Sequence, residues 1–260
     1  MFTVTMSYTV IIPARMRSTR LPEKPLRLIA GIPMVVRVAQ AAAQTEASRV
    51  VVATDHQKIL DVCRDFDIEA VLTREDHPTG TDRLAETVDL LKLPEDEVVV
   101  NVQGDEPLIP VETVNAVANL LQSRTDCAIA TAAHPISDLE SFKSPNVVKV
   151  LTDISGTALL FSRAPIPWPR DLWRKDPLLA PENFIAMHHI GLYAYRSSFL
   201  RLFPTLKQAP IEKTESLEQL RALYYGYKIA VLKLNQALPA GVDTEEDLAR
   251  VCAWFEMHAQ

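Results

Sequence analysis

The stretch Tyr8-Thr-Val-Ile-Ile-Pro13 decides the fold, because its run of β-favouring and mostly apolar residues leaves no polar face. A strand of this kind is covered on both sides, as the strands of parallel sheets are. Working outward, further strands are expected at 49–54, 69–72 and 97–102. Between and after the strands, helical patterns are expected at 33–44, 56–66, 81–91 and 111–122. The alternation predicts an α/β fold with a mainly parallel, doubly wound sheet, whose ligands lie at the carboxyl ends of the strands.

The second half of the chain changes character after residue 126. Strand-like segments with short connections are expected at 127–135, 147–151, 156–162, 188–195 and 229–234. The proline- and tryptophan-rich stretch 164–181 predicts a long loop. Helices are expected at 197–203, 211–225 and 245–257. We therefore expect one domain over 1–260, with a core at 8–135, a smaller inserted β-rich lobe at 136–235, and a C-terminal loop and helix at 236–260.

Composition excludes several classes of protein. With 27 Lys and Arg against 33 Asp and Glu, the net charge of -6 disfavours nucleic-acid binding, which needs a broad basic field. The three cysteines form no CxxC pair, which favours reduced thiols over a zinc site or a disulfide framework. No apolar run approaches the ~20 residues of a membrane span, and we expect no signal peptide at the start. These features predict a cytoplasmic protein that is not bound to a membrane.

A cluster of cations follows the first strand directly, in Pro13-Ala-Arg-Met-Arg-Ser-Thr-Arg-Leu-Pro-Glu-Lys-Pro25. Its charged and hydroxyl side chains are Arg15, Arg17, Ser18, Thr19, Arg20 and Lys24. Arginine can grip phosphate oxygens with two hydrogen bonds, and lysine acts as a point charge. A solvated basic loop is the alternative, but the place after a buried strand favours a polyphosphate site. The loop matches neither GxxxxGK[ST] nor GxGxxG, which disfavours P-loop NTPases and dinucleotide oxidoreductases.

Two acidic motifs complement this loop. In Val102-Gln-Gly-Asp-Glu-Pro107, Asp105 stands just past a buried strand, where a carboxylate can hold Mg²⁺ together with phosphate oxygens. Gly104 allows close backbone approach, and Gln103 can hydrogen-bond a hydroxylated substrate. In Gly241-Val-Asp-Thr-Glu-Glu-Asp247, Thr244 fits a helix N-cap. The motif alone leaves open whether Asp243 is a second Mg²⁺ ligand.

Two further groups leave alternatives open. The stretch Thr73-Arg-Glu-Asp-His-Pro-Thr-Gly-Thr-Asp-Arg83 leads into a helix, where backbone amides could read a base or ribose and Arg74 or Arg83 could contact phosphate. A capping turn with surface arginines explains the same residues. In the second half, His189 and Tyr193 share one face of a strand. On the helix expected at 211–225, Glu215 would stack with Glu218 and Gln219. Together with Arg163 these groups could bind an acidic sugar, although each residue taken alone fits a structural role.

The motifs occur in an order that resembles the 3-deoxy-manno-octulosonate (Kdo) cytidylyltransferases over nearly the whole chain. The matching stretches include Ile-Ile-Pro-Ala-Arg at 11–15, Asn-Val-Gln-Gly-Asp-Glu-Pro at 101–107, Phe-Ser-Arg-Ala-Pro-Ile-Pro-Trp at 161–168, His-Ile-Gly-Leu-Tyr at 189–193 and Gly-Val-Asp-Thr at 241–244. The resemblance implies a glycosyltransferase-A-like nucleotidyltransferase fold. It also implies the reaction of CTP with Kdo to give CMP-Kdo and pyrophosphate for lipopolysaccharide synthesis, with Mg²⁺ and in a homodimer.

The motifs and the resemblance together assign roles to residues. Catalysis is expected from Arg15, Lys24 and Asp105, and the metal from Asp105 and Asp243. CTP binding is expected from the core residues Ala14, Arg15, Ser18, Thr19, Arg20, Lys24, Arg74, Gly80, Thr81, Arg83 and Asp105. Kdo binding is expected from Gln103, Arg163, His189, Tyr193, Glu218 and Gln219. The lobe at 136–235 is then the sugar-binding and dimerisation part. Alternatives are a cytidylyltransferase for another acidic sugar (a sialic acid or an 8-amino Kdo analogue) and a non-catalytic nucleotide-binding module.

The chain departs from the usual family pattern at a few positions. Glu23 stands where the family usually has glycine, and Arg17 where a small residue is common. The approach to Asp243 is one residue shorter than usual. Because family members usually begin near Met6, we expect residues 1–5 to come from an upstream start.

Overall fold

The computed structural model describes residues 7–258, so the expected upstream start at residues 1–5 lies outside the described part. Contacts between Cα atoms divide the chain into two compact units. The larger unit takes the chain up to Gln122, then Leu192–Thr205, and the chain from Leu238 onward. The smaller unit consists of Ser123–Gly191 and Leu206–Ala237. The roles predicted for 8–135, 136–235 and 236–260 stay predictions.

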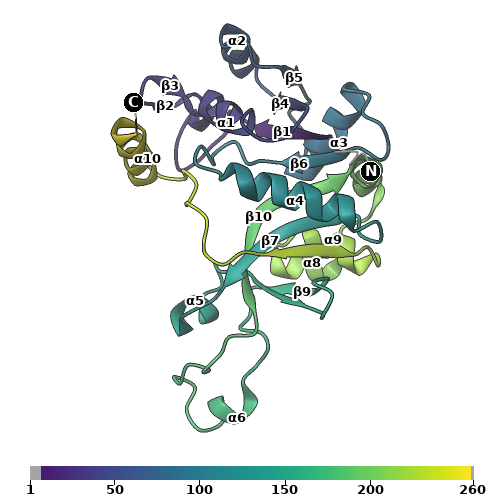
Figure 1. The fold of residues 1–260 in the computed structure, drawn as a ribbon, viewed down its shortest axis with the longest axis vertical. Helices are drawn as coiled ribbons and strands as arrows, with labels where there is room; N and C mark the ends of the chain where they lie inside the picture. The colour runs from purple at the N-terminus through teal and green to yellow at the C-terminus, as the bar shows by residue number, and fades with distance from the viewer. Residues whose placement is uncertain (1–6, 259–260) are drawn as a thin grey trace, which may run out of the picture. The chain divides into compact units, whose positions relative to one another are not determined.

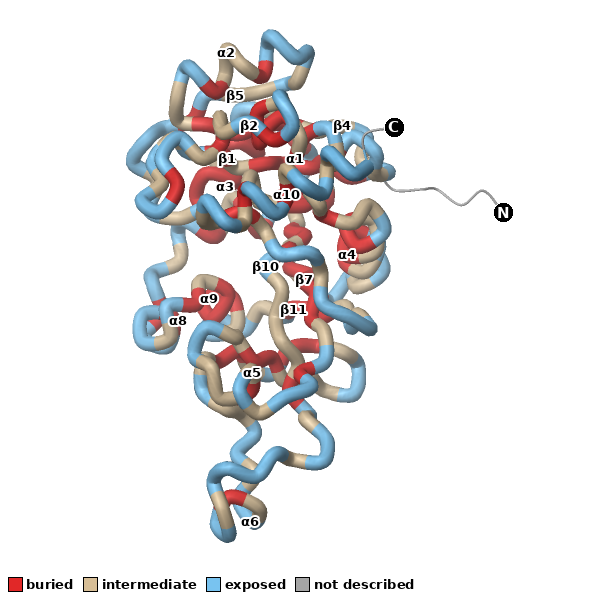
Figure 2. Tube along the Cα trace, turned by 90° about the vertical axis from the view of Figure 1, so that its left-hand side faces the viewer, coloured by how far each residue is buried: buried red, intermediate tan, exposed pale blue. Residues whose placement is uncertain are grey.

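The sheet of the larger unit is built around β1. Its strands are β1 (Tyr8–Ala14), β4 (Arg49–Thr54), β5 (Ala70–Leu72), β6 (Val98–Asn101) and the end of β10 (Met187–Arg196). β1 pairs in parallel with both β4 and β6, and β5 adds in parallel to β4 (Figure 1). Only β10 is antiparallel, with Tyr193 opposite Asn101. The predicted mainly parallel sheet is therefore confirmed. β1 is buried along nearly its whole length, as its continuous apolar run predicts (Figure 2).

Helices lie between and after these strands in the chain. They are α1 (Met34–Ala42), α2 (Gln57–Asp65), α3 (Gly80–Leu90), α4 (Val111–Ser123), α7 (Ser197–Leu202) and α10 (Glu245–Met257). Short elements are η1 (Lys24–Leu26), the hairpin of β2 (Leu28–Ile29) and β3 (Ile32–Pro33), and η2 (Phe203–Thr205). Side chains accept amide hydrogen bonds at the N-caps of three helices, His56 in α2, Thr79 in α3 and Thr244 in α10. These caps satisfy first-turn amides that have no partner inside the helix. In the part of the chain that the structure describes, no helix is long and apolar enough to cross a membrane.

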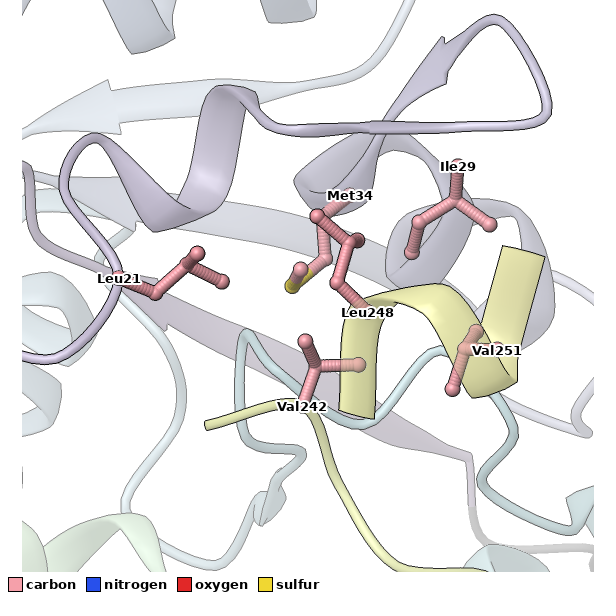
Figure 3. Close-up of a cluster of buried hydrophobic side chains, with 6 residues drawn as sticks. All are labelled: Leu21, Ile29, Met34, Val242, Leu248 and Val251. Atoms are coloured by element: carbon pink, nitrogen blue, oxygen red, sulfur yellow. The ribbon is translucent and has the colours of Figure 1, made fainter. Parts of the chain in front are cut away.

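A small hydrophobic cluster lies where the two ends of the larger unit meet. Its fully or almost fully buried members are Leu21, Ile29, Met34, Val242, Leu248 and Val251 (Figure 3). Leu21 comes from the cationic loop and Val242 stands beside Asp243, so one cluster anchors both segments. Burying a side chain of this size is worth about 1.5–3 kcal/mol.

The smaller unit is richer in strands. Its strands are β7 (Ile129–Pro135), β8 (Lys149–Thr152), β9 (Ala158–Ser162), β11 (Ile229–Lys233) and the start of β10. β7 and β11 pair in parallel, whereas β8 pairs antiparallel with β9 and with β10 at His188. Its helices are α5 (Leu139–Lys143), α6 (Arg170–Trp173), α8 (Pro210–Glu215) and α9 (Gln219–Tyr224). Phe142 of α5 and Trp173 of α6 pack into one cluster of buried side chains.

The single helix predicted at 211–225 is wrong. Ser216 adopts a left-handed backbone with φ 51° and ends α8, and α9 begins three residues later at Gln219. A left-handed residue cannot continue a right-handed helix. Glu215 consequently does not stack with Glu218 and Gln219. Its carboxylate instead accepts hydrogen bonds from Ser162 Oγ and from the backbone N–H of Arg163, at 2.6 and 2.9 Å.

Candidate active site

The cationic loop and the two acidic motifs meet in one pocket of the larger unit, at the carboxyl ends of β1 and β6. The pocket has a volume of about 450 Å³. It is lined by Pro13, Ala14, Arg15, Arg17, Ser18, Thr19, Arg20, Lys24, Pro25, Gln103, Gly104, Asp105 and Asp243. This brings together most of the residues predicted to bind triphosphate and metal.

Tight backbone contacts hold the three segments of this pocket in place. A Cβ atom on Gly104 would lie 2.8 Å from the carbonyl oxygen of Pro13, so only glycine allows the two strand ends to approach this closely. The N–H of Val242 donates to the carbonyl of Asp105 at 2.8 Å. A Cβ on Gly241 would lie 3.0 Å from that same oxygen. Gly104 therefore allows the Asp105 segment to approach β1, and Gly241 allows the Asp243 segment to approach Asp105.

Lys24 joins the two carboxylates. Its Nζ lies 2.5 Å from Asp105 Oδ2, 2.9 Å from Asp243 Oδ1 and 3.1 Å from the carbonyl oxygen of Val242. Burial of Lys24 opposes its charge, but the hydrogen bonds and charges of Asp105 and Asp243 outweigh burial and raise the pKa of the ammonium. Arg20 adds a second cation, with Nη2 3.0 Å from Asp243 Oδ2. Both carboxylates are thus paired with cations of the chain itself.

Two other arginines of the loop have no such partner. Arg15 and Arg17 are exposed, and within residues 7–258 neither forms an ion pair. Their charges are therefore available to an anion that enters the pocket. Glu23, the unusual acidic residue of this loop, has a left-handed backbone with φ 52° and ψ 32°. This conformation explains why glycine suits the position. The carboxylate of Glu23 lies 3.6 Å from the ammonium of Lys58 on α2.

The donors fit Mg²⁺ only in combination with a substrate. Asp105 and Asp243 supply hard carboxylate oxygens that already converge on one cation, the ammonium of Lys24. Within residues 7–258 there is no group of three or more His, Cys, Asp or Glu side chains that could hold a metal ion by itself. Mg²⁺ is commonly held by one or two carboxylates completed by phosphate oxygens and water. The pair is therefore suited to a metal that enters with a polyphosphate.

Glu106 is the acidic residue next to Asp105, and the sequence motifs assign it no role. Its Oε2 is buried and has no hydrogen-bond partner among the described residues. Burial and the neighbouring charge of Asp105 raise the pKa of Glu106 to about 7. Two adjacent acidic residues directly after a buried strand were the signal that could have identified it.

Arg83 lies in the interior and is linked to the cationic loop through Asp55. Its Nη2 is 2.8 Å from Asp55 Oδ2, and its Nη1 donates to Thr73 Oγ1. The other oxygen of Asp55 accepts from the N–H of Met16 in the cationic loop, at 3.3 Å. The alternative of surface arginines is therefore wrong for Arg83, which is 5% exposed. Its contact with CTP stays a prediction.

The remaining residues of the Thr73–Arg83 motif do not line the 450 Å³ pocket. Arg74 is exposed and pairs with Asp76, and Gly80 and Thr81 form the first turn of α3. Glu86 of α3 holds the loop by accepting from the N–H of Arg74 and by contacting the ring of His77. Burial opposes the charge of Glu86, but these hydrogen bonds outweigh burial and lower its pKa.

The predicted sugar-binding residues lie in both units. Gln103 lines the pocket of the larger unit, and Tyr193 in the same unit stacks on Tyr195. The other four, Arg163, His189, Glu218 and Gln219, belong to the smaller unit.

Within the smaller unit, the Arg163 guanidinium is held by main-chain carbonyls. Nε donates to Glu215 and Nη1 to Pro145, at 2.7 and 2.8 Å. His189 lies 3.1 Å from Thr131 Oγ1, and burial together with the charge of His188 lowers the pKa of His189 to about 3. A histidine with this pKa is neutral at pH 7, so it can donate or accept a hydrogen bond but carries no charge.

Glu218 and Gln219 stand at the start of α9. The amide nitrogen of Gln219 is buried and has no hydrogen-bond partner among the described residues. A buried donor without a partner costs about 1–3 kcal/mol, which a polar ligand could recover.

Comparisons with known proteins agree with this geometry. The chain matches the model of the family described as cytidylyltransferase over residues 9–229. It is similar to the structure of CMP:2-keto-3-deoxy-manno-octonic acid synthetase complexed with CTP, with 36% identity, a TM-score of 0.86, and coverage of 97% of this chain and 99% of that chain.

A second similar structure shares the fold alone. It is assigned as a glucose-1-phosphate thymidylyltransferase from Bacillus anthracis in complex with sucrose, at 15% identity and a TM-score of 0.63, and covers 95% of each chain. The nucleotidyltransferase fold predicted from the sequence is thus confirmed. Because the family model spans most of the chain and a relative of 36% identity covers nearly all of it, this chain belongs to the cytidylyltransferase family and is a nucleotidyltransferase.

Proposed function

We propose that the chain activates Kdo by the reaction of CTP with Kdo to give CMP-Kdo and pyrophosphate. The observation that carries this proposal is the convergence of four loop cations and two carboxylates in one pocket at the carboxyl edge of the sheet. Support for the nucleotide and the sugar comes from the relative of 36% identity, which is named for CMP and 2-keto-3-deoxy-manno-octonic acid and binds CTP.

In this proposal the cationic loop binds the triphosphate. Arg15 and Arg17 are exposed and meet the phosphates first, and Lys24 reaches the same pocket from η1. Cations held beside the departing pyrophosphate stabilise the charge that develops on it in the transition state. Asp105 and Asp243 would hold Mg²⁺ jointly with the phosphates. When bound, such an ion neutralises phosphate charge and lowers the pKa of a coordinated hydroxyl.

Kdo is an acidic, polyhydroxylated sugar, and the proposed contacts suit that chemistry. Gln103 would bind hydroxyl groups beside the triphosphate, and Tyr193 belongs to the same unit. In the smaller unit Arg163, His189, Glu218 and Gln219 would supply a cation for the carboxylate and hydrogen-bonding groups for hydroxyls. Arg163 would have to exchange one of its main-chain partners for the sugar carboxylate.

The proposal has a cellular part as well. CMP-Kdo would be made in the cytoplasm by a homodimer and used for lipopolysaccharide synthesis. Size-exclusion chromatography with light scattering tests the dimer, and fractionation of the native cells tests the compartment.

A pyrophosphate-release assay tests the chemistry. CTP is incubated with Mg²⁺ and with Kdo, a sialic acid or an 8-amino Kdo analogue in separate reactions. We expect turnover with Kdo, and we expect ATP, GTP and UTP to be poor substitutes for CTP. Turnover with another acidic sugar alone would reject Kdo as the substrate. CTP binding without turnover on any sugar would favour a non-catalytic module.

A matched pair of variants makes this assay specific. Asp105→Asn removes one carboxylate of the pocket, whereas Asp65→Asn makes the same change at an exposed position on α2. We expect Asp105→Asn to lower turnover by at least about 100-fold, the size of one lost electrostatic contact to a transition state. Asp65→Asn should leave turnover unchanged. Near-normal turnover of Asp105→Asn would reject the proposed site.

A further inference from the structure

The bridge formed by Lys24 has a consequence for metal binding. The ammonium has three N–H donors. It also has three acceptors, the carboxylates of Asp105 and Asp243 and the carbonyl of Val242. The side chain of Lys24 is only 17% exposed, so it lies inside the pocket wall and does not extend into solvent. The ammonium therefore fills the space between the two carboxylates.

A metal ion that bridged the same carboxylates would need this space. Mg²⁺ binds carboxylate oxygens at about 2.0–2.1 Å. The two oxygens lie 2.5 and 2.9 Å from Nζ, so the ammonium already occupies the place of a bridging ion. The ammonium and such an ion therefore exclude each other. The local charge gives the same result, because Lys24 and Arg20 balance Asp105 and Asp243. Because these four side chains together carry no net charge, they attract a free metal ion only weakly.

A polyphosphate changes this balance. Lys24 lines the same pocket as Arg15, Arg17 and Ser18, where the proposed function puts the triphosphate. Phosphate oxygens there offer the ammonium new acceptors of greater negative charge. A rotation of its flexible side chain toward them would free both carboxylates.

We propose that Lys24 is a built-in counter-cation, which keeps divalent metal ions away from the Asp105–Asp243 pair until a polyphosphate draws its ammonium away. This inference rests on the proposed function. Metal binding is then conditional on the nucleotide. This role is separate from any contact that Lys24 makes with the pyrophosphate during turnover.

Binding of Mn²⁺ alone, without nucleotide, tests the proposal. The free aqueous ion is followed by electron paramagnetic resonance for the wild type and for Lys24→Met. The variant should bind Mn²⁺ at least about 10-fold more tightly, within the usual range of coupling between sites. The gain should disappear in Lys24→Met/Asp105→Asn. Thermal unfolding gives a second readout, since Mg²⁺ alone should raise the Tm of the variant and not of the wild type.

Arg20→Met is the matched control. It removes the same charge from a side chain that is 66% exposed and whose ion pair, within residues 7–258, is with Asp243 and not with Asp105. A gain in Mn²⁺ affinity equal to that of Lys24→Met would mean that overall charge is responsible, and would overturn the proposal. Wild-type protein that binds Mn²⁺ as tightly as Lys24→Met would overturn it too, and Lys24→Gln replaces the Met variant if that one does not fold.

Pyrophosphate release by the wild type separates this proposal from the proposed function. If the wild type turns over CTP and Kdo but Lys24→Met binds Mn²⁺ no more tightly than the wild type, the counter-cation role of Lys24 is rejected and the proposed function stands. If Lys24→Met binds Mn²⁺ more tightly but the wild type shows no turnover, the proposed function is rejected and the role of Lys24 stands.

Discussion

The buried ion pair of Arg83 and Asp55 should control both the stability of the larger unit and the position of the cationic loop. The two side chains are 6% and 12% exposed, and the donor and acceptor atoms are 2.8 Å apart. Asp55 also accepts the N–H of Met16, and Arg83 also donates to Thr73. Asp55→Ala would therefore leave a buried guanidinium with one neutral partner and remove one anchor of the loop.

The expected loss of stability is large. Removing one partner of a buried pair costs about 3–5 kcal/mol, because the remaining charge stays in a poorly solvated site. For a chain of this size, about 2–4 °C of Tm is lost for each kcal/mol. Asp55→Ala should thus lower the Tm by about 6–20 °C. The double variant Asp55→Ala/Arg83→Met should cost less than the sum of the single variants, by about 0.5–3 kcal/mol.

An exposed pair provides the control. Arg201 and Asp89 also lie 2.8 Å apart, but Asp89 is 65% exposed. Asp89→Ala should cost no more than about 1 kcal/mol, as exposed pairs generally do. Urea unfolding and CTP titration are measured for all variants. If Arg83→Met weakened CTP binding without lowering stability, Arg83 would be a direct CTP ligand and the reasoning from burial would be wrong.

Three further predictions follow from single residues. Glu23→Gly should be more stable than Glu23→Ala by about 1 kcal/mol in urea unfolding, because both lose the charge but only glycine relieves the left-handed backbone; equal stability would contradict this. Gly104→Ala should abolish CTP binding in calorimetry while the protein still folds, because the new Cβ would lie 2.8 Å from a main-chain carbonyl oxygen. Glu86 contacts His77, and its pKa in the folded protein is lowered from the ordinary value of 4.5. Ionised Glu86 therefore stabilises the fold at pH values above 4.5, and this stabilisation is lost as the pH falls below 4.5. Glu86→Gln should therefore lose less stability than the wild type between about pH 7 and pH 3.5, and an equal loss would count against the assignment.

The elements that the sequence predicted best have strong local signals. The strand at 49–54 and the helix at 245–257 are confirmed at both ends. The first contains three consecutive valines, and the second begins with a capping box of Thr244 and Asp247. The helix at 211–225 failed because one residue, Ser216, turned out left-handed, which no helical periodicity reveals. The five-residue helix α5 was missed because it is held by the cap of Asp138 and by packing of Phe142.

The sequence predicts which residues line the pocket better than it predicts their contacts. Motif chemistry groups Lys24, Asp105 and Asp243, and all three line one pocket, although Lys24 and Asp243 are separated by 219 positions in the chain. Their functional roles stay predictions. That the lysine bridges both carboxylates depends on tertiary geometry, which motif spacing does not contain. Arg83 shows the reverse case. Its sequence environment suggested a surface or a phosphate contact, and only the fold reveals that it is buried against Asp55.

The position of Asp243 in the pocket depends on the packing of side chains that do not line it. Val242 is fully buried in the cluster of Figure 3, together with Leu248 and Val251 of α10 and with Leu21 of the cationic loop. The same cluster therefore anchors both the segment that carries Asp243 and the loop that carries the cations. Because a buried side chain prefers one position and the backbone next to it must follow, burial of Val242 aligns Asp243 before any ligand arrives. The C-terminal helix thus supports the candidate active site even though the pocket is lined by none of its residues.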